Sequence, residues 1–392
     1  MQYEGGISMQ GNFSYYNPTK LYFGKNAIEN LEAELLQYGK NILLVYGGGS
    51  IKKNGIYQEV CAILETLDKN IYEISGVMPN PTYDKLQEGC QLAKDKNVDF
   101  ILAVGGGSVI DYAKGVANCT YCNGDAWTRY YVNWEDVDND ILPVGCILTM
   151  VGTGSEMNTG SVITNDTYKI GRIYDDRSYP KFTILDPTYT YTLPKYQMVA
   201  GIFDIMSHIL EQYLSGNNDS TSDYLAEALM KSLIHSSLIA IEEPTNYEAR
   251  SNIMWTATWA LNNLIGSGKP QDWQAHGIGE TIGAYTNATH GMTLSATALA
   301  YYHTQLPYAI DQYARFAKNV WNIEKETKEE TALAGLEAMK QWMEQLGLVM
   351  HIEELGVTKD MLETIANQVS SNESAYLPLT PEIVMNILKE SW

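Results

Sequence analysis

The feature that most constrains the fold is a regular alternation, between residues 27 and 188, of short apolar runs with amphipathic stretches of helix length. This alternation is typical of strands and helices that follow one another in an α/β domain. The apolar runs are continuous, which indicates strands buried on both faces of a parallel sheet covered by helices. The predicted strands span residues 41–46, 70–75, 99–104, 143–149 and 181–186, and alternating residues at 161–175 predict an inserted hairpin.

After Asp186-Pro187 the pattern changes to long helical periodicity with few β-branched runs. The predicted helices lie at 195–215, 220–242, 246–264 and 324–348. A chain of 392 residues exceeds one ordinary hydrophobic core, so two domains are expected. We therefore predict an α/β domain over residues 1–188 and an all-helical domain over residues 189–392.

Composition and charge exclude several classes of function. Hydrophobic residues make up 45% of the chain and charged residues 19%, as in a globular protein. The formal charge of −21 repels nucleic acids and anionic lipid surfaces, so we expect small-molecule partners and no nucleic acid or membrane. Five cysteines leave one unpaired, which favours the cytoplasm. Neither a secretion signal nor an uninterrupted apolar span is evident.

Two of the predicted strands run directly into glycine-rich turns before a helix. Gly47-Gly48-Gly49-Ser50 follows the strand at 41–46, and Gly105-Gly106-Gly107-Ser108 follows the strand at 99–104. Glycines let backbone amides approach a ligand closely, and the helix N-terminus favours a pyrophosphate. Neither loop has the spaced glycine fingerprint of the Rossmann motif, and one alone is more often a tight turn. Two at the strand ends of one sheet favour a nucleotide site, to which the turn at 149–156 contributes by association.

Asp204 and His208 are four residues apart, so on a helix they share one face and can reach one cation. Such a pair by itself has a structural alternative, an Asp bonded to a helical neighbour beside a half-buried His. The chain has six histidines, and His276 and His290 each precede a glycine, which leaves room for a metal and a substrate. One carboxylate and three imidazoles suit Zn²⁺ or Fe²⁺. The other three histidines, His235, His303 and His351, are expected on helix faces or the surface.

Together these motifs resemble the iron-containing (group III) alcohol dehydrogenases over nearly the whole chain. The matching segments are Phe23-Gly24, GGGSVIDYAK at 105–114, TMVGTGSE at 149–156, Asp204-x-x-x-His208, and His276 with His290-Gly291. Residues 46–53 and 270–273 look most like the butanol dehydrogenase and broad-specificity NADPH-dependent aldehyde reductase branch. The resemblance implies a Rossmann-like dinucleotide-binding α/β domain, a helical metal-binding domain in a dehydroquinate synthase-like fold, an active site between them, and a homodimer.

The resemblance also implies roles for individual residues. The metal ligands carry over to Asp204, His208, His276 and His290. The cofactor-binding residues carry over to Gly48, Gly49, Ser50, Asn80, Gly106, Gly107, Ser108, Asp111, Thr149, Thr153 and Lys169. The family commonly has a second histidine four residues after the one at 276, and here that position is Glu280. Glu280 is a proton acceptor, an extra ligand or a sign of a different substrate, and we prefer the proton acceptor.

The implied reaction is NAD(P)(H)-linked interconversion of small primary alcohols, such as butanol, and aldehydes, with one divalent metal, Fe²⁺ or Zn²⁺. Lys52 and Lys53, with no acidic residue at the end of the strand at 41–46, favour NADP(H) over NAD(H). Two alternatives stay open. One is a dehydroquinate synthase-like carbon–oxygen lyase, although residues 204–300 are sparse in Lys and Arg. The other is a catalytically impaired cofactor-binding relative.

Overall fold

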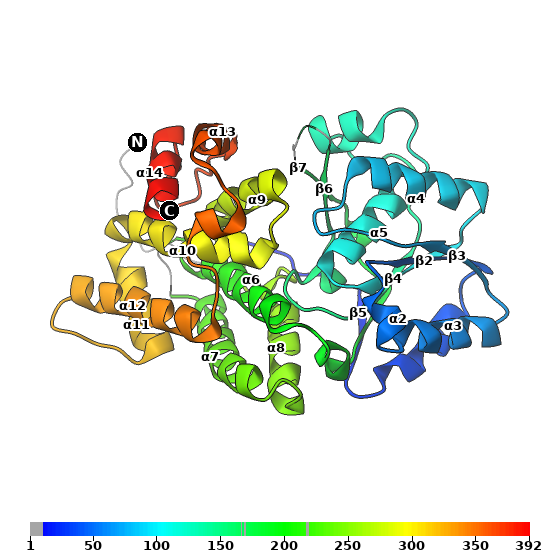
Figure 1. Cartoon of the computed structure of the whole chain (residues 1–392), viewed down its shortest axis with the longest axis horizontal. Coiled ribbons are helices and arrows are strands. Elements are labelled where there is room, and N and C mark those ends of the chain that lie inside the picture. Colours follow the sequence, from blue (N-terminus) through cyan, green and yellow to red (C-terminus); the bar gives the residue numbers. More distant parts are fainter. Residues whose placement is uncertain (1–10, 166, 168–169, 217–218) are drawn as a thin grey trace. The chain divides into compact units, whose positions relative to one another are not determined.

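The computed structural model describes residues 11–165, 167, 170–216 and 219–392. It forms two compact units, which we call the α/β unit (residues 16–194) and the helical unit (residues 195–392 with 11–15). Figure 1 shows the elements of both. Short helical turns in the two units lie at Ala27–Asn30, Trp127–Val132, Ser155–Met157, Asp176–Ser178, Pro187–Thr190, Leu306–Tyr308, Ile352–Leu355 and Lys359–Met361.

The α/β unit is built on a parallel six-stranded sheet in the order β1-β8-β5-β4-β2-β3. The strands are β1 (Lys20–Phe23), β2 (Asn41–Tyr46), β3 (Asn70–Ile74), β4 (Phe100–Gly105), β5 (Val144–Leu148) and β8 (Phe182–Leu185). From β2 the chain moves outward to β3, and it then returns to β4 on the other side of β2 before continuing to β5 and β8. Doubly wound sheets bind ligands where the order reverses, beyond the carboxyl ends of the strands, which here means between β2 and β4.

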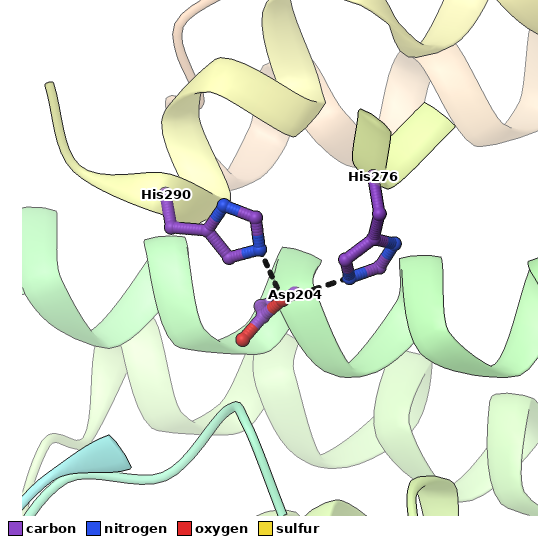
Figure 2. Close-up of side chains that lie close together, drawn as sticks. All are labelled: Asp204, His276 and His290. Atoms are coloured by element: carbon purple, nitrogen blue, oxygen red, sulfur yellow. Dashed lines mark ion pairs between the residues drawn. The ribbon is translucent and has the colours of Figure 1, made fainter. Parts of the chain in front are cut away.

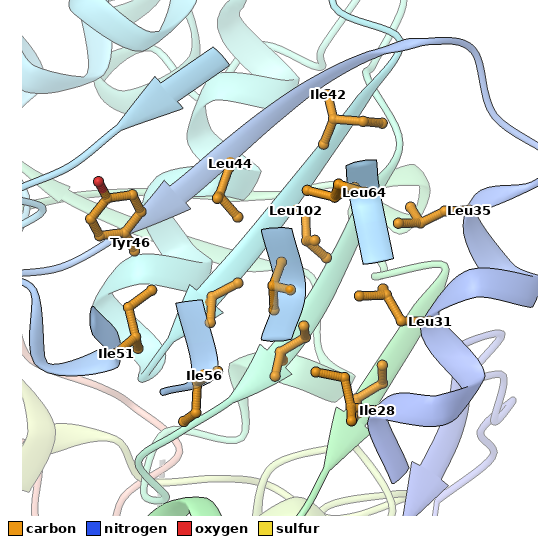
Figure 3. Packing of buried hydrophobic residues seen from close by; sticks show 14 of the residues in the cluster. Ile28, Leu31, Leu35, Ile42, Leu44, Tyr46, Ile51, Ile56, Leu64 and Leu102 are labelled. Atoms are coloured by element: carbon orange, nitrogen blue, oxygen red, sulfur yellow. The ribbon is translucent and has the colours of Figure 1, made fainter. Parts of the chain in front are cut away.

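Both faces of this sheet are covered, which explains the continuous apolar strands. The helices α1 (Leu31–Leu35), α2 (Ser50–Lys53) and α3 (Ile56–Thr66) pack on one face, and α4 (Tyr83–Asp95) and α5 (Gly107–Cys119) lie on the other (Figure 1). Figure 3 shows the first of these layers, where Ile42, Leu44 and Tyr46 of β2 belong to one buried cluster with Leu31 of α1 and Leu64 of α3. The intervening Leu43 and Val45 are equally buried because strand side chains alternate between the two faces.

The predicted hairpin is present as β6 (Gly160–Thr164) and β7 (Ile170–Tyr174), which pair antiparallel and stand apart from the main sheet. The strand β6 packs on α5, where the Ser161 hydroxyl donates to the backbone oxygen of Asp111 at 2.8 Å. The five strands predicted for the sheet are confirmed within one residue at each end. The strand β1 was not predicted, since its four residues at the sheet edge are too short to show a pattern.

The helical unit contains helices only among its described residues, as predicted. They are α6 (Lys195–Tyr213), α7 (Thr221–Glu242), α8 (Tyr247–Ala260), α9 (Gln274–Thr286), α10 (His290–Gln305), α11 (Ile310–Trp321), α12 (Lys328–Leu346), α13 (Leu362–Gln368) and α14 (Pro381–Glu390). Local sequence sets several starts: Ser220 with Asp223 and Thr327 with Glu330 form capping boxes on α7 and α12. Every residue of α6 from Met198 to Tyr213 is buried, so α6 is the central helix of the unit.

One described helix, α7, is long and apolar enough in composition to cross a membrane. It packs against α6, α8, α11 and α12 in the helical unit. Its first turn is tied into the unit by Asp223, which forms a buried ion pair with Lys269. These contacts account for the apolar composition of α7 as that of a core helix.

Candidate metal centre

The centre begins on α6, whose buried middle carries Asp204 and His208 one helical turn apart. Both side chains are 5% exposed, and His208 Nε2 lies 3.7 Å from Asp204 Oδ1. A carboxylate this deep in a protein is costly unless it is paired or binds a cation. The position of Asp204 in the core helix therefore requires positive or hydrogen-bonding partners from other helices.

Those partners come from the N-terminal turns of α9 and α10 (Figure 2). His276 Nε2 lies 3.6 Å from Asp204 Oδ1, and His290 Nε2 lies 3.5 Å from the same oxygen. Ligand atoms of Asp204, His276 and His290 lie within 4.8 Å of one another. The structure thus brings all four predicted ligands together, with His208 close to the same oxygen but outside this three-residue group.

The spacing of these atoms fits a cation. Asp204 Oδ1 and His276 Nε2 are buried, and neither has a hydrogen-bond partner among the described residues. Distances of 3.5–3.7 Å are too long for hydrogen bonds. Two tetrahedral ligands at about 2.1 Å from one zinc ion are roughly 3.4 Å apart. The donor set of one carboxylate and several imidazoles therefore suits Zn²⁺ or Fe²⁺.

The electrostatics of the centre favour positive charge. Burial raises the pKa of Asp204, but His208, His276 and His290 outweigh it and hold the pKa well below the usual range of a carboxyl group. Burial lowers the pKa of His276, but Glu211 and Asp204 outweigh it and raise that pKa to about 9. Asp204 therefore stays ionised, and the two carboxylates near His276 stabilise positive charge at its ring. The His290 side chain is 28% exposed and marks the open side of the centre.

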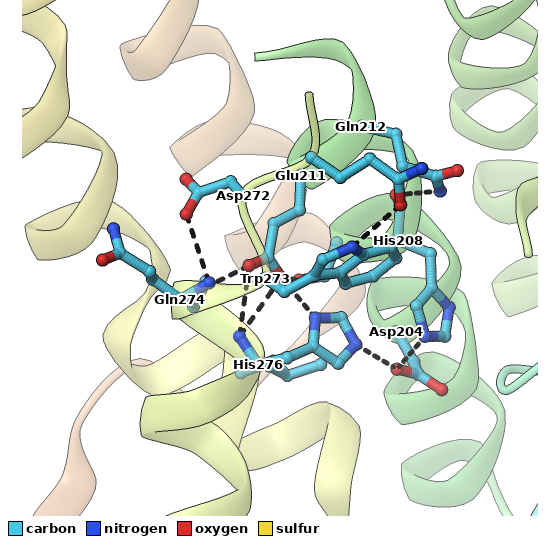
Figure 4. Close-up of polar contacts among 12 residues, drawn as sticks. Asp204, His208, Glu211, Gln212, Asp272, Trp273, Gln274 and His276 are labelled. Atoms are coloured by element: carbon cyan, nitrogen blue, oxygen red, sulfur yellow. Dashed lines mark hydrogen bonds and ion pairs between the residues drawn. The ribbon is translucent and has the colours of Figure 1, made fainter. Parts of the chain in front are cut away.

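Glu211, which sequence reasoning missed, supports His276 from behind (Figure 4). Its side chain is fully buried, and one carboxylate oxygen accepts a hydrogen bond from His276 Nδ1. The backbone amides of Ala275 and His276 also donate to this carboxylate, at 2.9 and 3.2 Å. A signal was available, because Asp204, His208 and Glu211 stand at i, i+4 and i+7 on one face of α6.

Behind Glu211 lies a buried polar group that precedes α9. Asp272 accepts from the Tyr301 hydroxyl and from the backbone amide of Gln274, the latter at 3.2 Å. Burial, and then the neighbouring Glu211 carboxylate, raise the pKa of Asp272 to about 7. Trp273 follows with a left-handed φ of 61°, and its ring meets the rings of His208 and His276 edge-on. The segment that leads into α9 and His276 is therefore fixed by buried contacts.

Gly291 has a different role from the one expected. A Cβ there would stand 1.9 Å from the backbone oxygen of Ala200, so the missing side chain lets α10 approach α6. This close approach brings His290 to Asp204. At Gly277 a Cβ would meet only Val369, at 3.8 Å, which is ordinary contact. The glycine after His290 thus serves helix packing, whereas the sequence argument gave it the role of making room for ligands.

The other candidates in the helical unit are also placed. Glu280 lies on α9 one turn after His276 and is half-buried, with a buried Oε2. His235, His303 and His351 are exposed, as predicted.

In the α/β unit, the two glycine loops follow β2 and β4, the strands on either side of the reversal in sheet order. At the second loop, a Cβ on Gly107 would stand 2.1 Å from Thr153 Oγ1, and one on Gly106 would stand 3.1 Å from Met150. The backbone amide of Thr149 donates to Gly105 at 3.0 Å. These contacts place the turn after β5 beside the N-terminus of α5, where Ser108 is half-buried.

The first loop is open by comparison. A Cβ on Gly48 or Gly49 would meet nothing within 4 Å, and Ser50 is exposed. Gly49 has a φ of 95°, which a side chain would strain. Asn80 also has a left-handed φ, of 54°, and its buried Nδ2 lacks a hydrogen-bond partner among the described residues.

Asp111 and Lys169 are the two remaining residues predicted for the cofactor. Asp111 is buried in α5, where Oδ2 accepts from the Val162 amide at 3.2 Å, and Lys114 lies 3.8 Å from Oδ1. Lys114 is fully buried and donates to Ser155 and Asn158, so it ties α5 to the turn after β5. Lys169 lies outside the described residues.

Comparison with known proteins shows the family of the chain over nearly its whole length. A family model described as iron-containing alcohol dehydrogenase matches residues 18–187, and the C-terminal model of the Fe-containing alcohol dehydrogenase family matches residues 198–392. The chain is 38% identical over 390 residues to NADH-dependent butanol dehydrogenase A of Clostridium acetobutylicum, covering 97% of this chain and 100% of that protein.

Two more relatives extend the comparison. NADPH-dependent aldehyde reductase YqhD of Escherichia coli is 34% identical over 380 residues, covering 96% of this chain and 97% of that protein. The crystal structure of NADH-dependent butanol dehydrogenase A from Thermotoga maritima is similar with a TM-score of 0.92 at 34% identity, covering 97% of this chain and 98% of that chain.

Proposed function

This chain belongs to the iron-containing alcohol dehydrogenase family, and we propose that it interconverts small primary alcohols, such as butanol, and their aldehydes. As a member of this family, it is an NAD(P)-dependent oxidoreductase that acts on CH–OH groups. The observation that carries the proposal is the convergence of three imidazole Nε2 atoms on one buried carboxylate oxygen, at 3.5–3.7 Å.

Asp204, His208, His276 and His290 would hold one divalent cation, Fe²⁺ or Zn²⁺. When bound, such a cation supplies Lewis-acid polarisation of an alcohol or carbonyl oxygen, and the nicotinamide exchanges hydride with the carbon. The residues of the chain do the rest. Asp204 supplies the compensating negative charge, the buried His276 excludes water, and the partly exposed His290 leaves one side accessible to a substrate.

Glu280 takes the alcohol proton in this proposal, in the position where the family commonly has histidine. Its support is the placement on α9 one turn after His276, with Oε2 buried. We expect Glu280→Gln to lower kcat for butanol oxidation while metal content stays unchanged. Glu280→His should restore turnover with a shifted pH profile. Loss of metal in Glu280→Gln would instead make Glu280 a ligand.

The proposed nucleotide site is the switch point between β2 and β4. Gly106, Gly107 and Ser108 would offer the N-terminus of α5 to the pyrophosphate. Thr149 and Thr153 would line the same track. Asp111 would act from the nicotinamide side, where its carboxylate accepts from the Val162 amide of β6. The remaining residues proposed for the cofactor are Gly48, Gly49, Ser50, Asn80 and Lys169.

For the cofactor we favour NADP(H) over NAD(H). The loop from Gly47 to Lys53 carries no carboxylate, and Lys53 is exposed. Lys52 already has partners within the chain, because its amine lies over the ring of Tyr57 and 3.6 Å from Glu73 Oε2. The named relatives include both an NADH-dependent and an NADPH-dependent enzyme. The ratio of kcat/KM for NADPH and NADH with butanal tests the preference, and a large NADH advantage would refute it.

We also propose that the enzyme is a cytoplasmic homodimer. The five cysteines are free thiols, as suits a reducing compartment. Within the described part of the chain, β1 pairs with β8 alone, which leaves its other edge for a partner chain. Light scattering on the purified protein should give twice the chain mass.

The experiment that tests the function uses dialysed protein and butanal, with NADPH or NADH, and with or without added Zn²⁺ or Fe²⁺. We expect aldehyde-dependent loss of reduced cofactor that requires one of the metals. A protein that binds the metal and the nucleotide but shows no turnover with any short aldehyde would contradict the proposal.

A further inference from the structure

The carboxylate of Glu211 is the most heavily bonded acidic group beside the metal centre among the described residues. It is fully buried, and it accepts from His276 Nδ1 and from the amides of Ala275 and His276. The hydroxyl of Ser207, one turn earlier on α6, donates to it at 3.4 Å. Its own backbone oxygen accepts from the Asp272 amide at 2.9 Å. One residue of α6 thus holds both the backbone and the ring of His276.

The two amide contacts have a clear physical cause. The first amides of a helix have no partner within it, and α9 has no side-chain cap because Trp273 stands at its N-cap. Glu211 supplies the missing acceptor from another helix, and its negative charge is favoured at the N-terminus of α9. The carboxylate is therefore anchored by the backbone independently of the imidazole.

The contact with the ring decides which nitrogen can bind a metal. An ionised carboxylate only accepts hydrogen bonds, so His276 Nδ1 must be the donor. In a neutral imidazole the other nitrogen, Nε2, then carries the lone pair. Nε2 is the atom that lies 3.6 Å from Asp204 Oδ1, on the side of the proposed cation.

We propose that Glu211 is a positioning residue that fixes His276 in the Nδ1-protonated form and thereby sets the metal affinity of the centre. The inference rests on the proposed metal site and adds a residue that does not contact the cation. Carboxylates behind metal-binding histidines typically contribute about 10–100-fold to metal affinity. Because the amide contacts anchor Glu211 separately, its effect on the ring can be tested without removing the side chain.

The test compares Glu211→Gln with a matched control. A glutamine keeps the shape and one acceptor oxygen, but its NH₂ group facing Nδ1 would favour protonation of Nε2, which blocks the metal. Glu227→Gln is the control, because Glu227 is also a buried carboxylate of the helical unit. It bonds Tyr213 and Arg315 and, among the described residues, no histidine. Binding of Zn²⁺, and of Co²⁺ by its visible absorption, is titrated on metal-free protein, with far-UV circular dichroism as a check of folding.

We expect metal affinity to fall about 10–100-fold in Glu211→Gln and to stay within about twofold of wild type in Glu227→Gln. Equal affinity in folded Glu211→Gln and wild type would overturn the role of Glu211. Absence of metal binding by the wild-type protein would instead refute the proposed function.

A second experiment needs no variant and records the ¹⁵N spectrum of histidine-labelled, Zn²⁺-loaded wild type. Metal on Nε2 of His276 with a proton on Nδ1 supports the proposal, and metal on Nδ1 overturns it.

Discussion

The metal centre and the glycine loops use opposite means to prepare a site. In the helical unit, the proposed ligands are buried side chains from α6, α9 and α10, and Glu211 holds one of them in place. In the α/β unit, the loops after β2 and β4 offer backbone at the ends of strands. The glycines of the first loop leave its backbone open, and those of the second loop let the turn after β5 pack closely. The comparison teaches that the metal centre depends on individual side chains, whereas the glycine loops depend on positions without a side chain.

The sharpest way to break the comparison is to remove one imidazole. In His276→Ala we expect metal affinity to fall by more than about 100-fold, since even a residue behind the ligands contributes about 10–100-fold. Activity should disappear with the metal, while the fold persists. Metal content and turnover measure the effect, with His235→Ala on the exposed face of α7 as control. Full turnover by metal-free His276→Ala would contradict the account.

A smaller effect is expected at Gly291, the position where the helical unit depends on a glycine. Gly291→Ala places a Cβ against the backbone oxygen of Ala200 and should destabilise the protein by about 1–3 kcal/mol or more. The shift of α10 should also weaken metal binding through His290. Urea unfolding and metal titration check both effects. Gly277→Ala, which meets only Val369, is the matched control, and equal losses in the two variants would argue against the packing explanation.

The α/β unit offers the corresponding test on its loops. Gly107→Ala meets Thr153 and should cost about 1–3 kcal/mol of stability. Gly48→Ala meets nothing within 4 Å, so its stability should change by less than about 0.5 kcal/mol. Its KM for the nicotinamide cofactor should nevertheless rise, because the added methyl group occupies the open face. Unchanged KM in Gly48→Ala would remove the first loop from the proposed nucleotide site.

The smallest effect concerns pH. The pKa of Asp272 is raised to about 7, so the folded state binds this proton more tightly than the unfolded state does. The stabilisation from Asp272 is complete below about pH 4 and is lost as the pH rises through about 7. In metal-free protein, Asp272→Asn should therefore reduce the fall in urea midpoint between pH 5 and 8. An unchanged slope, equal to that of the exposed Asp95→Asn control, would show that Asp272 does not titrate in this range.

The sequence was sufficient for features that depend on local pattern. Continuous apolar runs predicted the strands from β2 to β5 and β8, and the i, i+4 spacing of Asp204 and His208 predicted a shared helix face. The order of the strands did not follow from the sequence, because it depends on pairing between distant segments. The reversal between β2 and β4 explains why two ordinary glycine turns form one candidate site.

Contacts between helices explain what sequence reasoning missed. Glu211 shares a face of α6 with Asp204 and His208, but its partners, the first amides of α9 and the His276 ring, belong to another helix. Gly291 stands beside His290 in the sequence, but its partner, the Ala200 carbonyl, belongs to another helix. A single sequence does not show which distant backbone a residue contacts, so these two roles could not be predicted from it.

The central claim is that one divalent cation, held by Asp204, His208, His276 and His290, is required for alcohol and aldehyde turnover. Elemental analysis of the purified protein, followed by chelation and readdition of metal, tests it most directly. We expect about one equivalent of iron or zinc per chain, loss of butanal reduction when it is removed, and recovery when it is restored. Undiminished butanal reduction by protein with no detectable metal would contradict the account.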